Sequence, residues 1–288
     1  MKQLSIFTIK EKEIVVPSTK DKITIWFFGD VHRDTKACDV DRWKWFLTKA
    51  KELSDPEFTY YMCMGDTHDF ASYREQQKIK SANLHQQTIE SIEELIQKRN
   101  RHFCQEIKQM RGKLLGFIEG NHSWVFENGV SSTEDLASRM ETEYLGWLTF
   151  FTLKFRLQKS VNLNYYIAAC HGRGGGKLIG TSINQVADMK TVFPSADLFV
   201  AGHNHDRGAW PSNILLPHSR TDGTTQLKQK RQFIIRSGSF MKAYETGEPS
   251  YAVSRLMRPA DLGAIRITIG FHQDRKDNRY IVDTEAHV

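Results

Sequence analysis

Residues 23–32 read ITIWFFGDVH, an apolar and aromatic run that ends in a glycine, an aspartate and a histidine. A continuous run of apolar and β-branched residues is typical of a strand that is buried on both faces of a sheet. Asp30 and His32 follow at the point where this strand would end. Because open α/β sheets bind ligands at the carboxyl ends of their strands, the segment predicts both a central strand and part of a functional site.

Four later apolar runs end in the same kind of polar cluster. The runs cover residues 58–64, 114–119, 161–170 and 198–201, and they lead into Gly65-Asp66-Thr67-His68-Asp69, Gly120-Asn121-His122, His171-Gly172 and Gly202-His203-Asn204-His205. A glycine beside a ligand lets the backbone turn sharply and approach a metal ion closely. Each cluster alone has an ordinary explanation as a turn, but five in order, each at the end of an apolar run, predict one metal site.

The types of donor narrow the choice of metal. Carboxylates together with imidazoles favour manganese, iron or zinc over calcium, which prefers oxygen ligands alone. One tetrahedral ion has too few positions for all the candidate ligands, so the pattern suits two ions that share a bridging carboxylate. The candidate ligands are Asp30, His32, Asp66, Asn121, His171, His203 and His205.

Taken in order, the clusters resemble the pattern of the calcineurin-like metallophosphoesterases: D-x-H, G-D-x-x-D, G-N-H, a single H, and G-H-x-H. The resemblance runs from Asp30 to His205. It implies an α/β fold in which two packed mixed β-sheets are flanked by helices, a four-layer αββα sandwich with the site at one end. No shift in composition marks a linker, so we expect a single domain over 1–288, with its motif core in 23–240.

The resemblance also implies a role for each position. Asp30, His32 and His205 would hold one metal ion, Asn121, His171 and His203 would hold the second, and Asp66 would bridge the two. His122 would bind no metal but would lie over the leaving group, hydrogen-bonded to Asp69. A protonated His122 could pass its proton to the leaving oxygen, and the opposite charge of Asp69 would favour that protonated form. These two residues are the expected catalytic pair.

The implied reaction is hydrolysis of a phosphate ester by a hydroxide that bridges two divalent metal ions. We expect Mn²⁺ first, with Fe, Zn or Ni as alternatives. The net charge of +6 suits an anionic substrate and favours a phosphodiesterase, including a nuclease. A phosphomonoesterase acting on nucleotides or small phosphorylated molecules is the first alternative. The second is a non-catalytic scaffold that keeps the metal site.

Two further residues are candidate substrate contacts. His68 lies inside the second cluster, where it suits either a substrate group or a solvated loop. Arg173 opens a basic, glycine-rich stretch that could bind phosphate through its guanidinium and backbone N–H groups, or could simply form a turn. Phe70 and Ala71 replace the Arg-Gly of the Ser/Thr protein phosphatases, which argues against that activity. Ser123 also departs from the family, since many members carry Asp or Glu after the histidine.

Composition limits the partners and the location. Hydrophobic residues are 40% and charged residues 26% of the chain, as in an ordinary globular protein. No apolar run approaches the ~20 residues that span a bilayer, and the N-terminus lacks a signal-peptide pattern, so we expect a cytoplasmic protein without a membrane partner. The four cysteines form no C-x-x-C pair and are expected to be reduced thiols. A phosphate-ester substrate is the expected partner, nucleic acid is a further candidate, and the oligomeric state stays open.

Patterns outside the clusters predict local structure. Short β-like runs at 4–9 and 13–16 suggest a hairpin, and 76–111 suggests one long basic helix with a break near Asn100. The other expected elements are strands at 148–157, 161–170, 233–237 and 264–269, helices at 39–53, 131–147 and 181–192, a polar loop at 211–231, and a charged C-terminal tail, about 274–288, that frays.

Overall fold

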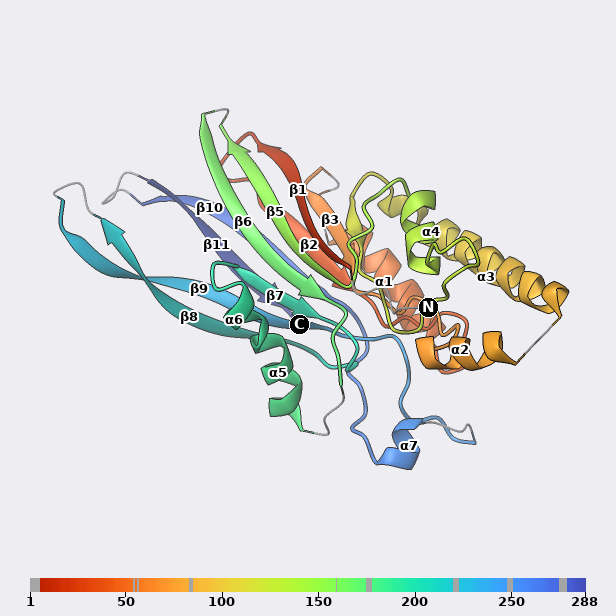
Figure 1. The fold of residues 1–288 in the computed structure, drawn as a ribbon. Helices are drawn as coiled ribbons and strands as arrows, with labels where there is room; N and C mark the ends of the chain where they lie inside the picture. The colour runs from red at the N-terminus through yellow and green to blue at the C-terminus, as the bar shows by residue number, and fades with distance from the viewer. Residues whose placement is uncertain are drawn as a thin grey trace.

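The structure is a computed structural model that describes residues 6–53, 55, 57–82, 85–158, 160–174, 178–219, 223–247, 251–274 and 279–288. Two mixed β-sheets pack against each other, and helices cover their outer faces (Figure 1). This arrangement confirms the fold class that the sequence predicts.

The first sheet has six strands in the order β1-β5-β6-β7-β9-β8, and the second has five in the order β11-β10-β2-β3-β4. The first comprises β1 (Phe7–Val16), β5 (Leu148–Leu157), β6 (Val161–Cys170), β7 (Leu198–Ala201), β9 (Thr225–Ser237) and β8 (Arg207–Ser219). The second comprises β11 (Arg279–His287), β10 (Ile265–Asp274), β2 (Ile23–Phe28), β3 (Thr59–Cys63) and β4 (Leu114–Phe117). Strands β2, β3 and β4 run parallel, as do β6, β7 and β9. Each parallel set therefore ends at one edge of its sheet.

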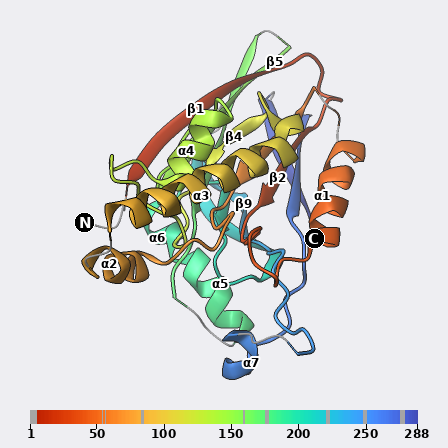
Figure 2. The same cartoon turned by 90° about the vertical axis from the view of Figure 1, so that its right-hand side faces the viewer.

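Helices cover both outer faces (Figures 1 and 2). Helices α1 (Val40–Glu52), α3 (Gln86–Glu106) and α4 (Ser132–Arg139) pack on the second sheet, and α5 (Ile179–Ala187) and α6 (Met189–Val192) pack on the first. The remaining helices are α2 (Tyr73–Ser81), α7 (Tyr251–Arg255) and the short 3-10 helix η1 (Lys108–Met110). Within the described residues, no helix combines the length and the apolar character that crossing a membrane requires.

The main hydrophobic core lies between the two sheets. Ile25 and Phe27 of β2 point into it and pack with inward-facing residues of β5 such as Leu153. Trp26 and Phe28 point to the opposite face of β2, where they contact the aromatic side chains of α1. All residues of β2 are therefore buried, which explains why its sequence shows no alternation of polar and apolar residues.

Two segments in the first half of the chain differ from the prediction. Phe7–Val16 forms one strand instead of a hairpin, because it pairs along its whole length with β5. The predicted helix of 76–111 is two helices, and the break precedes Gln86 instead of lying near Asn100. Asn100 is buried inside α3 and donates to the Ser132 carbonyl oxygen at 2.8 Å. It therefore ties α3 to α4 where a break was expected.

Three segments in the second half also differ. The predicted loop of 211–231 is an antiparallel hairpin of β8 and β9. Pro211 and Pro217 disguise the first of these strands, and they are tolerated there because β8 is the edge of its sheet. The C-terminal tail does not fray, since β11 pairs along its length with β10. The helix expected to reach Trp147 ends at Arg139.

Trp43 and Trp45, both on α1, allow a matched test of the core beneath the second sheet. Trp43 is 1% exposed and Trp45 is 45% exposed. The Trp43 ring lies 5.7 Å from the Phe103 ring and 5.0 Å from the Phe240 ring, measured between centroids. Trp43→Ala should therefore lower the free energy of unfolding in urea by about 3–5 kcal/mol. Trp45→Ala should lower it by less than about 1 kcal/mol, and equal losses would contradict the packing described.

Candidate metal centre

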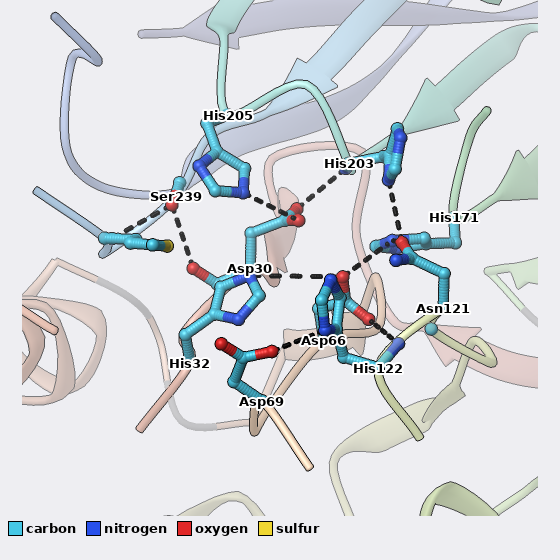
Figure 3. A network of polar contacts seen from close by, with 12 residues as sticks. Asp30, His32, Asp66, Asp69, Asn121, His122, His171, His203, His205 and Ser239 are labelled. Carbon is cyan, nitrogen blue, oxygen red and sulfur yellow. Dashed lines mark hydrogen bonds and ion pairs between the residues drawn. The ribbon is translucent and has the colours of Figure 1, made fainter. Parts of the chain in front are cut away.

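Five loops, each at the carboxyl end of a strand, meet at one end of the sandwich (Figure 3). Three of them follow β2, β3 and β4 of the second sheet, and two follow β6 and β7 of the first. In that order they supply Asp30 and His32, Asp66 and Asp69, Asn121 and His122, His171, and His203 and His205. Both sheets therefore contribute to the site.

The donors form two groups. The first is Asp30, His32 and His205, the second is Asp66, His171 and His203, and the ligand atoms of each group lie within 4.8 Å of one another. His205 Nε2 lies 3.5 Å from Asp30 Oδ1 in the first group, and His171 Nε2 lies 3.0 Å from Asp66 Oδ2 in the second. Asp66 Oδ2 is also 4.0 Å from His32 Nε2, so this carboxylate faces both groups.

Asn121 lies with the second group. Its Oδ1 is 2.8 Å from His171 Nε2 and 2.8 Å from His203 Nδ1. An amide oxygen that faces two imidazole nitrogens adds one more donor at the same point. The structure thus brings all the predicted ligands into one cluster.

The backbone is left-handed at most of these ligands. The φ angles are 47° at Asp30, 44° at His32, 45° at Asp66, 71° at His203 and 58° at His205. Such conformations are uncommon for residues that carry a side chain and cost roughly 1–3 kcal/mol each. Hydrogen bonds between loops hold them, since the Asp30 N–H donates to the Gly65 carbonyl at 3.0 Å and the His32 N–H to the Asp66 carbonyl at 3.1 Å.

Two glycines make room for ligands that come from the opposite sheet. A Cβ on Gly202 would lie 2.6 Å from Asp30 Oδ2, and a Cβ on Gly65 would lie 2.7 Å from His171 Nδ1. Both distances are shorter than real Cβ atoms show, so any side chain would push a ligand away. The glycines in the motifs therefore serve packing between loops as well as the turn itself.

Several donors of the first group are buried without a hydrogen-bond partner. They are Asp30 Oδ1 and both ring nitrogens of His32. Unpaired buried polar atoms are rare because each costs free energy. A divalent cation binds such oxygen and nitrogen donors together, and the mixture of carboxylate, imidazole and amide favours Mn, Fe or Zn over Ca. The residues present therefore fit a pair of divalent metal ions.

Charge is shared unevenly within the second group. Burial would lower the pKa of His171, but the Asp66 carboxylate raises it to about 9. Burial would raise the pKa of Asp66, and His171 lowers it below the usual range. Burial, together with the charge of His171, lowers the pKa of His203 to about 4 and keeps that ring neutral. A cation among these donors would compete with the His171 proton, so metal binding should release protons.

Asp69 and His122 form an ion pair beside the first group. Asp69 Oδ1 pairs with His122 Nδ1, and the His122 ring lies 5.3 Å from the His32 ring. Burial lowers the pKa of His122, but the hydrogen bond from Asp69 and the charge of Asp66 outweigh it and leave the pKa raised. The pair leaves Nε2 as the nitrogen that can exchange a proton with a bound molecule.

The two predicted substrate contacts differ in their surroundings. His68 is buried and stacks on Phe70, with ring centroids 4.6 Å apart. Burial lowers its pKa to about 3, so it packs as a neutral aromatic ring, which favours a structural role over substrate contact. Arg173 is exposed just after His171, and the following residues 175–177 lie outside the described part of the chain.

Glu119 supports the loop of Asn121 and does not stand out in the sequence. It is buried and accepts hydrogen bonds from Ser131 Oγ at 2.7 Å and from Tyr144 OH at 2.7 Å. Ser123, the departure from the family pattern, donates to the same carboxylate. Burial raises the pKa of Glu119, and these hydroxyl donors oppose that shift. The acid position directly before Gly120 is the only signal that the sequence offers.

Arg236 supports the loop of His203. It is buried in β9 and donates to the Gly202 carbonyl at 2.7 Å and to the Ser182 carbonyl at 2.6 Å. An arginine within the apolar run of 233–237 could have indicated a buried polar contact, but its partners depend on the fold.

Comparison with known proteins is limited to distant structural likeness. A scan against protein-family models gives no match, and a search of curated proteins gives none. Solved structures that resemble the chain include Vps29 of Chaetomium thermophilum, at TM-score 0.34 and 11% identity, over 92% of this chain and 95% of Vps29. A Vps29 double mutant of Entamoeba histolytica gives TM-score 0.37 and 10% identity, over 92% and 100%. GAP50 of Plasmodium, described as the anchor in the inner membrane complex, gives 0.42 and 11%, over 92% and 88%.

Gly202 and Gly180 provide a matched test of the centre. A side chain at Gly202 meets Asp30, whereas a Cβ on Gly180 in α5 meets nothing within 4 Å. Gly202→Ala should therefore weaken Mn²⁺ binding about tenfold or more, measured by calorimetry and by bound metal after gel filtration. Gly180→Ala should bind metal as the wild type does and gain up to ~1 kcal/mol in stability. Unchanged metal binding in Gly202→Ala would argue that the donors are not a metal site.

Proposed function

We propose that this protein is a dinuclear metal-dependent phosphoesterase of the calcineurin-like kind, and that it hydrolyses phosphodiesters. One observation carries the proposal: two groups of donors share the buried Asp66 carboxylate, with the Asp69–His122 pair beside them. Burying so many ionisable groups costs free energy and is a poor way to stabilise a fold. Their convergence is better explained by a function that needs them.

The two groups define how metal ions would be held. Asp30, His32 and His205 would hold one ion, Asn121, His171 and His203 would hold the other, and Asp66 would contact both. When bound, two such cations lower the pKa of a shared water and offset the charge of a phosphate. We propose Mn²⁺ as the ion, while Fe, Zn and Ni also suit these nitrogen and oxygen donors.

The chain itself would supply the proton for the leaving group. His122 has a raised pKa, so it can hold a proton near neutral pH. Asp69 engages Nδ1 and orients the ring, which leaves the proton on Nε2 for transfer to the leaving oxygen. Such help matters most when the leaving oxygen is strongly basic. His122 and Asp69 therefore take the catalytic roles in this proposal.

The preference for a diester rests on charge. The net charge is +6, and Arg173 is exposed beside the centre. Some basic residues that could guide nucleic acid are already paired, since Arg111 binds Glu141 and Lys230 lies 2.8 Å from Asp197. We therefore put small phosphodiesters first and nucleic acid second as substrates.

The same donors would serve two alternatives. A phosphomonoesterase needs the same centre with a tighter pocket around the phosphate. A non-catalytic scaffold needs metal ligands at most, and it has no use for a proton donor held by a carboxylate. The intact Asp69–His122 pair therefore favours an enzyme.

The cysteines suit a reducing compartment. Cys38, Cys63 and Cys104 are buried and Cys170 is half-buried, and all of them are free thiols. We accordingly propose a cytoplasmic location.

Asp66→Asn tests the proposed reaction. With Mn²⁺, the wild type should hydrolyse bis-p-nitrophenyl phosphate, and Asp66→Asn should lower kcat/KM by about 10² or more, because the shared carboxylate is lost. Asp283→Asn, at an exposed position on β11, should behave as the wild type. Turnover of p-nitrophenyl phosphate alone would favour the monoesterase. Absence of metal-dependent turnover on either ester would favour the scaffold.

Asp69→Asn tests the proton donor. Loss of the carboxylate removes the group that orients His122, so we expect a drop in kcat of about tenfold on p-nitrophenyl esters and about 10² or more on esters of unsubstituted phenol. The measurement is kcat over a series of aryl methyl phosphodiesters. An equal drop across the series would mean that His122 is not the acid.

A further inference from the structure

Helix α2 is attached to the rest of the molecule in an unusual way. A surface helix normally buries an apolar stripe, but among the described residues of α2 the buried side chain is a glutamine, Gln76, at 2% exposed. Such a buried amide must find hydrogen-bond partners, because leaving it unpaired would cost about 1–3 kcal/mol. Its partners therefore indicate what the helix holds in place.

The Gln76 amide joins two segments that are distant in sequence. Its Nε2 donates to the Ala71 carbonyl at 2.9 Å and to the Ser123 carbonyl, and its Oε1 accepts the Val125 N–H at 3.0 Å. Both N–H groups and the carbonyl oxygen are thus used. Ala71 lies two residues after Asp69, and Ser123 directly follows His122.

Further contacts hold the same two segments together. Lys80, one turn along α2, donates to the Val125 carbonyl at 2.7 Å, and its ammonium lies 5.1 Å from the centre of the Trp124 ring. The Phe70 N–H donates to the His122 carbonyl at 3.3 Å. Helix α2 therefore fastens to the segment that follows His122, with Gln76 at the centre of the attachment.

We propose that Gln76 is a positioning residue that keeps Asp69 and His122 in register for proton transfer. The inference rests on the proposed function, in which His122 is the acid. The side chains of His122 and Asp69 are 28% and 35% exposed, and an ion pair this open is too weak to set its own geometry. The backbone of both residues must be held from outside the pair, and the Gln76 amide spans both.

The position of Gln76 separates this role from metal binding. All three of its hydrogen bonds go to backbone groups of residues 71, 123 and 125, and none goes to a candidate metal ligand. Asn121 is held separately, through the contacts of Glu119 with the same loop. Loss of the amide should therefore disturb proton transfer while two metal ions still bind.

The variant Gln76→Met keeps the size of the side chain and removes the amide, and Gln77→Met makes the same change at an exposed position on the same helix. We expect Gln76→Met to lose about 10–100-fold in kcat on methyl phenyl phosphate and less than about threefold on methyl p-nitrophenyl phosphate. Gln77→Met should match the wild type on both. Bound Mn²⁺ should be equal in all three proteins.

Two further measurements make the result decisive. In a His122→Gln background, Gln76→Met should cause no additional loss, because the residue acts through His122. Amide exchange in a peptide of residues 121–126 should be faster in Gln76→Met than in Gln77→Met.

Contrary results have distinct meanings. An equal loss on both esters, a loss that persists without His122, or a loss of bound metal would make Gln76 merely structural and overturn the inference. If the wild type shows no metal-dependent turnover, the proposed function is wrong, and the exchange measurement alone decides whether Gln76 holds the His122 segment.

Discussion

The Asp66 carboxylate joins the two sheets, and the rest of the site is arranged around it. It stands on the loop after β3 in the second sheet, and its Oδ2 lies 3.0 Å from His171 Nε2, which follows β6 in the first. Its Oδ1 accepts the His122 N–H at 3.0 Å, so the loop after β4 is tied to the same group. A buried carboxylate is stable only with partners of this kind. The apolar core brings the strand ends together, and this carboxylate determines how the loops meet.

The centre is costly for the fold, and the surrounding structure offsets that cost. Ligands in left-handed conformations and unpaired buried donors both raise the free energy of the native state. The core between the sheets and the aromatic cluster around Trp43 stabilise it. Buried polar groups such as Glu119 and Arg236 add hydrogen bonds to the loops themselves. Regions under strain that persist in a stable fold are commonly those that function requires.

The sequence could predict the strand ends and the donors on them, because a fully buried strand has a distinctive composition and a glycine-ligand cluster has few other uses. It could not predict the β8–β9 hairpin, since Pro211 and the alternating polar residues of an edge strand look like a loop. Asn100 looked like a helix breaker because its partner lies on another helix. Gln76 is invisible for the same reason: an amide becomes informative only when the fold shows which backbone groups it reaches.

The prolines of β8 also bear on how the molecule meets its own copies. A strand at the edge of a sheet offers a row of unpaired backbone groups, and a second chain can add to it and begin aggregation. Pro211 and Pro217 have no N–H to offer, and they stand six residues apart on the same side of β8. Any strand that approached this edge would find two gaps in the row of donors. The extended hairpin can therefore project from the sandwich without becoming a template for polymerisation.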